Sequence, residues 1–130
     1  MTIEFDLTPI VEAAREEDDS WPEEYDANVR ETQRQCGKLM DAVNRALEYF
    51  PAGITVEAAG HIYHGITDAI VDAYVIDAGR GRLKTAVSLD FGHGLKWAGK
   101  CEFCIKPGDV MKIEAQDGAV RIWIEERKAE

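Results

Sequence analysis

Leu83-Lys-Thr-Ala-Val-Ser-Leu-Asp-Phe91 alternates two sets of side chains: Leu83, Thr85, Val87, Leu89 and Phe91 against Lys84, Ala86, Ser88 and Asp90. A period of two is typical of a β-strand with one face buried. The preceding Ala78-Gly-Arg-Gly-Arg82 predicts a hairpin loop, so we expect this strand to pair with another over residues 70–77.

The rest of the second half of the chain continues this pattern. Further strands are predicted over residues 54–58, 100–106, 110–116 and 119–126. Pro107-Gly-Asp109 and Asp117-Gly118 are strong turn signals between the last three. The expected sheet is therefore an antiparallel meander of five to six strands.

Two helices are predicted before the strands. Thr8-Pro9 is typical of an N-cap followed by proline at the first helical position, which predicts a short helix over residues 8–17. Ser20, with Glu23 three residues later, has the spacing of a capping box and predicts a long second helix to about Phe50. Apolar residues at helical spacing support this second helix: Val29, Cys36, Leu39, Met40, Val43, Leu47 and Phe50.

These elements predict a single α+β domain over residues 1–130, in which one short and one long N-terminal helix pack on the meander sheet. The first residues, Met1-Thr-Ile-Glu-Phe-Asp6, lack the basic and apolar regions of a signal peptide. No apolar run is long enough to span a membrane. Three cysteines, an odd number, favour reduced thiols in the cytoplasm over a disulfide framework.

The formal charge of the chain is distributed very unevenly. The whole chain carries a net charge of −10, and residues 1–26 hold ten acids against one base, Arg15. The rest of the chain is nearly neutral. A concentrated negative surface repels nucleic-acid phosphates and attracts basic protein surfaces. We therefore expect no direct binding of DNA or RNA through this segment.

The acidic segment also contains two aromatic residues, Trp21 and Tyr25, which could anchor a protein partner. The predicted partner-binding residues are Glu16, Glu17, Asp18, Asp19, Trp21, Glu23, Glu24, Tyr25 and Asp26. Two simpler interpretations stay open. The acids could form an ordinary solvated face that keeps the protein soluble, and one or both rings could fold back onto the core.

Other polar clusters predict weaker sites. Arg80, Arg82 and Lys84 lie beside glycines at the hairpin tip and could bind an anion, or contact the acidic segment. His61, His64, His93, Cys101 and Cys104 include the ligand types of a zinc site. However, a strand would place Cys101 and Cys104 on opposite faces, so we predict no bound metal or other cofactor.

No spacing typical of a known catalytic motif is present, so we do not expect an enzyme. The favoured hypothesis is a small acidic inhibitor that occludes a basic surface of a nucleic-acid-binding protein. A phage anti-defence protein that mimics nucleic acid, or an immunity protein for a nuclease toxin, would act in this way. The alternatives are a zinc- or ligand-binding domain or minor enzyme that uses the histidines and cysteines, and a structural subunit of a phage or other assembly.

Overall fold

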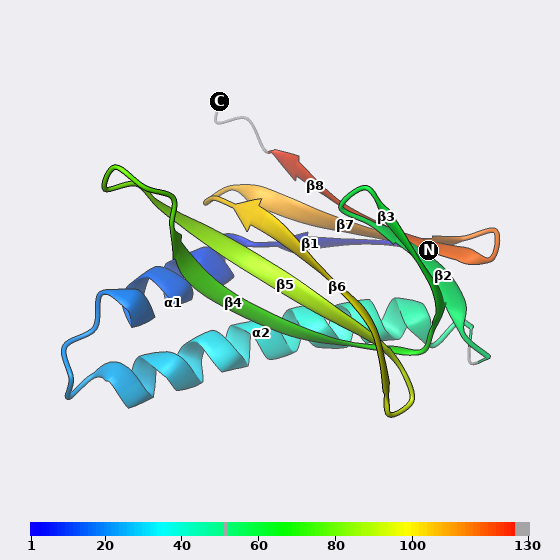
Figure 1. Ribbon diagram of the computed structural model, residues 1–130, viewed down its shortest axis with the longest axis horizontal. Helices are drawn as coiled ribbons and strands as arrows, with labels where there is room; N and C mark the ends of the chain where they lie inside the picture. The colour runs from blue at the N-terminus through cyan, green and yellow to red at the C-terminus, as the bar shows by residue number, and fades with distance from the viewer. Residues whose placement is uncertain (51, 127–130) are drawn as a thin grey trace.

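The computed structural model describes residues 1–50 and 52–126, which form two helices and eight strands (Figure 1). The helices are α1 (Thr8–Asp18) and α2 (Tyr25–Leu47). The strands are β1 (Thr2–Asp6), β2 (Ile54–Ala58), β3 (His61–Ile66), β4 (Asp68–Asp77), β5 (Leu83–His93), β6 (Lys96–Ile105), β7 (Asp109–Gln116) and β8 (Ala119–Glu126). The predicted α+β class, with a short and a long helix near the N-terminus, is confirmed.

The strands form two sheets. One has five strands in the order β1-β7-β8-β2-β3, and the other has three in the order β4-β5-β6. Neighbouring strands are antiparallel except β2 and β8, which pair in parallel. The predicted meander is correct for β4 to β6 and for β7 and β8. This parallel pair places β2, the first strand after the helices, beside β8, the last strand described.

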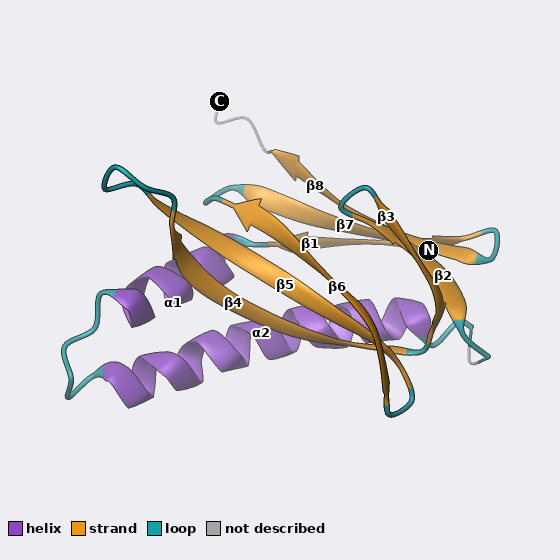
Figure 2. Cartoon of the chain, viewed as in Figure 1, coloured by secondary structure: helices purple, strands orange, loops and turns teal. Residues whose placement is uncertain are grey.

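The two helices lie side by side and run along β4 (Figure 2). At the edge of β4, the Asn44 side chain of α2 accepts a hydrogen bond from the Ala69 amide at 2.9 Å and donates one to the Ala69 carbonyl at 3.1 Å. Buried residues from both helices and both sheets form one cluster, which includes Leu39, Phe91 and Met111. The two sheets and two helices therefore share a single hydrophobic core.

Tyr63 of β3 packs against β6, the outer strand of the three-stranded sheet on the side opposite β4. Its hydroxyl donates a hydrogen bond to the Lys100 carbonyl at 3.1 Å, and its ring centroid lies 4.9 Å from that of Phe91. A Cβ atom at Gly99 would lie 2.6 Å from the Tyr63 ring, closer than real side chains approach. Gly99 is thus required because the ring packs directly on the backbone of β6.

Two strands were not predicted. β1 is short and precedes α1, and it pairs with β7 through Ile3 opposite Ile113. β3 is mostly exposed and lacks an apolar alternation. The turn before β3 places Ala59 and Gly60 at positive φ, and alanine at such a position gives no sequence signal of a hairpin.

Both predicted helix caps are wrong. The N-cap of α1 is Leu7, and Asp6 Oδ1 accepts the Thr8 amide at 3.0 Å, while Thr8 Oγ1 accepts the Gly108 amide at 2.8 Å. The long helix starts at Tyr25 rather than after Ser20, so there is no capping box, and it ends at Leu47 rather than Phe50. Ser20 does not cap α2 because its hydroxyl donates a hydrogen bond to the Glu16 carbonyl near the end of α1.

Candidate functional site

The acidic residues gather around the connection between α1 and α2. Ser20 Oγ donates a hydrogen bond to the Glu16 carbonyl at 2.7 Å and accepts one from Asn28 Nδ2 at 2.6 Å. The Glu24 amide donates to the Trp21 carbonyl at 2.9 Å. These contacts tie the end of α1 to the start of α2 and fold the connection into a defined turn.

We call this part of the surface the acidic end. It comprises Glu16, Asp18, Asp19, Trp21, Glu23, Glu24, Tyr25 and Asp26, all of which are exposed. Glu16, Asp19, Trp21, Glu23 and Glu24 border one open hollow of about 670 Å³. The structure therefore brings together five of the nine residues that we predicted as partner-binding from their proximity in sequence.

The two aromatic residues of the acidic end do not fold back onto the core. The Trp21 side chain is 70% exposed and Tyr25 is 47% exposed. The interpretation that either ring is part of the core is therefore wrong. Large aromatic side chains held in solvent beside acids are available to contact a partner.

Glu17 differs from its acidic neighbours. It is half-buried and faces Thr32 of α2 and Asp72 of β4. Partial burial raises the pKa of the Glu17 carboxyl, and the nearby Asp72 carboxylate adds to this rise. Glu17 thus belongs to the packing between α1, α2 and β4 rather than to the exposed acidic end.

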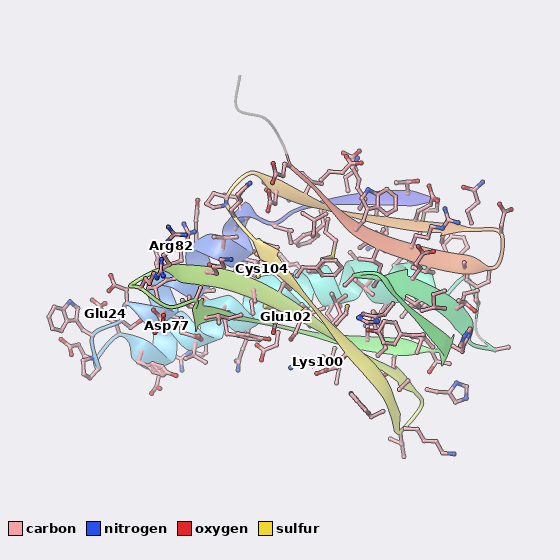
Figure 3. All side chains as sticks on the ribbon, turned by 45° about the horizontal axis from the view of Figure 1, so that its top comes forward. Glu24, Asp77, Arg82, Lys100, Glu102 and Cys104 are labelled. Atoms are coloured by element: carbon pink, nitrogen blue, oxygen red, sulfur yellow. The ribbon has the colours of Figure 1, made fainter. Side chains whose placement is uncertain are left out.

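The tip of the β4–β5 hairpin, with Arg82, and the connection between α1 and α2, with Glu24, lie at the same end of the molecule (Figure 3), but Figure 1 shows them well apart. Arg80, Arg82 and Lys84 are all exposed. Asp77 Oδ1 accepts the Gly79 amide at 2.8 Å, and Arg80 adopts a left-handed φ of 55°. Within residues 1–50 and 52–126 no ion pair joins these three cations to the acidic end.

The candidate zinc ligands are spread over several elements. Cys101 is buried, and burial raises the pKa of its thiol to about 11, whereas Cys104 is exposed on the other face of β6, as the strand pattern predicts. Nδ1 of His93 donates to the Gly65 carbonyl at 2.6 Å, and His61 and His64 are exposed on β3. In the described part of the chain, no three His, Cys, Asp or Glu side chains are placed to hold a metal ion.

A polar cluster on the outer face of the three-stranded sheet was not predicted. Tyr74 of β4 donates a hydrogen bond to Glu102 of β6 across the strand between them, and Lys100 lies 5.9 Å from the centre of the Tyr74 ring. Burial is the larger cause, and the hydrogen bond to Glu102 the second, of a rise in the pKa of Tyr74 to about 12. The cluster links the two outer strands of the sheet, β4 and β6, across β5.

Sequence reasoning also missed a groove beside α1. Two hollows, of about 340 and 390 Å³, share Arg15, Leu83 and Thr85 in their walls. We call the two hollows together the Thr85 groove. The Thr85 side chain is 1% exposed, and among the described residues its Oγ1 is the only buried side-chain nitrogen or oxygen without a hydrogen-bond partner. Arg15 is far from Leu83 in sequence, so no local pattern could have revealed this groove.

Replacing Thr85 with valine should raise the free energy of unfolding by about 1 kcal/mol, because a buried hydroxyl without a partner is destabilising. Thr32→Val is the matched control. Thr32 is 2% exposed, but its hydroxyl donates to the Asn28 carbonyl at 3.1 Å, so its loss should lower stability by about 1 kcal/mol. Urea unfolding of both variants measures the difference. Equal destabilisation by the two changes would show that the Thr85 hydroxyl has a partner in solution.

Comparisons with protein-family models, curated proteins and solved structures found no match to the chain. Among the described helices, none is both long and apolar enough to cross a membrane. The surface of the protein is therefore what indicates its function.

Proposed function

We propose that the protein is a small cytoplasmic inhibitor whose acidic end occludes a basic, nucleic-acid-binding surface of a partner protein. The observation that carries the proposal is the open hollow lined by the exposed Trp21 and by four acidic residues, Glu16, Asp19, Glu23 and Glu24. Carboxylates can occupy the positions that phosphates take in a basic groove, and a central aromatic ring supplies buried contact area. Two roles fit this chemistry: a phage protein that blocks a host defence enzyme, and an immunity protein for a basic nuclease.

The acidic end has a defined geometry, which favours a binding surface over an acidic face that only keeps the protein solvated. The hydrogen bonds of Ser20 and Asn28 hold the connection between the helices in place before any partner arrives. A surface that is already ordered loses less conformational entropy on binding than a flexible tail does. The direct binding of nucleic acid to this end is opposed by its charge.

Neutralising the hollow should weaken partner binding at least tenfold, which is about 1.4 kcal/mol, and should flatten the dependence of affinity on salt. The variant carries Glu16→Gln, Asp19→Asn, Glu23→Gln and Glu24→Gln. The partner is first captured from nuclease-treated host lysate at low salt and identified by mass spectrometry. Its affinity for wild type and variant is then measured over a series of salt concentrations.

The control variant has the same net charge but leaves the acidic end intact. It carries Asp41→Asn, Glu48→Gln, Glu57→Gln and Asp117→Asn, at four exposed positions elsewhere on the surface. It should bind the partner nearly as well as wild type does. Equal losses of affinity in both variants would show that overall charge, and not the acidic end, controls binding, and would contradict the proposal.

A further inference from the structure

The Thr85 groove carries charged groups of both signs that have no ion-pair partner within the described residues. Asp18 and Asp19 border one hollow, Lys84 borders the other, and Arg15 borders both. None of these four side chains makes an ion pair in this part of the chain. The groove therefore presents separate positive and negative groups to whatever enters it.

The other charged groups at the groove already have partners within the protein. Lys106 Nζ lies 2.6 Å from Glu126 Oε1, and Asp109 Oδ2 accepts the Lys106 amide at 3.0 Å. Asp109 is also buried. The charges left for a ligand are thus the two carboxylates at the end of α1 and the cations of Arg15 and Lys84.

Apolar side chains complete the groove. Val75 and Leu83 line one hollow, and Leu83 and Ile105 line the other. Thr85 lines both hollows, but its hydroxyl is buried and does not reach their surface. Each hollow is within the usual size range of small-ligand sites, roughly 300 to 1,000 Å³.

We propose that the Thr85 groove binds a small zwitterion with an apolar side chain, of the class of the aliphatic amino acids. The ligand's carboxylate lies between Arg15 and Lys84, and its ammonium group faces Asp18 and Asp19. Its side chain packs on Leu83. Arg15 is three and four residues from the two acids on α1, which is the spacing of neighbours on one helix face. That closeness suits a ligand whose two charges are on adjacent groups.

The test titrates L-leucine into isotopically labelled protein and follows the backbone amide resonances by NMR. Two half-ligands accompany it: 4-methylpentanoate, which lacks the ammonium group, and 3-methylbutylamine, which lacks the carboxylate. L-leucine should give saturable shifts at the amides of Asp18, Leu83 and Thr85. Each half-ligand should bind at least tenfold more weakly, because it satisfies charges of one sign only.

Variants identify the groups that bind. Arg15→Gln should weaken the binding of L-leucine at least tenfold while leaving the affinity for 3-methylbutylamine unchanged. Thr85→Val should leave the affinity for L-leucine unchanged, because the hydroxyl that it removes is buried beneath the groove. The control Arg30→Gln, at an exposed position of α2, should bind L-leucine as wild type does.

Two results would overturn this proposal. One is the absence of saturable shifts at the groove with L-leucine up to its solubility limit. The other is an equal affinity for L-leucine and for either half-ligand. Because the titration uses the isolated protein, its failure leaves the proposed inhibition of a partner protein unaffected.

Discussion

Phe91→Ala should lower the free energy of unfolding by about 3 to 5 kcal/mol, the cost of removing a fully buried aromatic side chain and leaving a cavity. Phe91 is 0% exposed and lies in the central strand of the three-stranded sheet. Its ring also contacts Tyr63 of the five-stranded sheet. The substitution therefore removes core volume and a contact that joins the two sheets.

Urea unfolding monitored by circular dichroism measures the effect of Phe91→Ala, and Ile70→Ala is its control. Ile70 lies on the neighbouring strand β4, is 58% exposed and faces away from the core. Its replacement should change the free energy of unfolding by no more than about 0.5 kcal/mol. A loss below about 1 kcal/mol for Phe91→Ala would contradict a core that both sheets share.

Trp21→Ala should weaken binding to the partner by about 2 kcal/mol or more, roughly 30-fold, without a measurable change in stability. The ring is 70% exposed in the isolated protein, so the fold gains little from it. In a complex, the acidic groups around the hollow would exclude water from the contact, and a central aromatic residue in such a position commonly dominates the binding energy. Titration calorimetry with the captured partner, together with thermal unfolding, measures both quantities.

Trp97→Ala is the matched control for Trp21→Ala. Trp97 is 72% exposed, nearly the same as Trp21, but it lies on β6 outside the acidic end. Its loss should leave the affinity unchanged. If both substitutions weaken binding equally, or neither does, the acidic end is not the docking surface. Trp21→Phe should keep part of the affinity, because a smaller ring still fills the same site.

The fold was predictable where the signal is local. The alternation of residues 83–91 and the apolar stripe of α2 predict elements that the structure contains. The division into two sheets was not predictable, because it depends on the parallel pairing of β2 with β8, which are far apart in sequence. The start of α2 was misplaced because Ser20 bonds to the preceding helix, a choice between two neighbours that the sequence does not reveal.

The candidate site was predictable in its composition but not in its geometry. The charge of residues 1–26 identifies the acidic end, and the exposure of Trp21 and Tyr25 is known only once the turn between the helices is seen. Glu17 could not be distinguished from its neighbours by sequence, since its burial depends on β4. The Thr85 groove likewise needs α1 and β5 to be side by side.

The side chains on the outer strands of the three-stranded sheet bear on how the protein behaves when it is concentrated. An uncovered strand edge is a template on which copies of a chain can assemble into aggregates. Here Asn44 binds the backbone of β4, Tyr63 binds the Lys100 carbonyl on β6, and Asp109 binds the Lys106 amide at the end of β6. Three side chains from separate elements thus occupy backbone groups at both edges of this sheet that would otherwise be open to pairing with another copy of the chain.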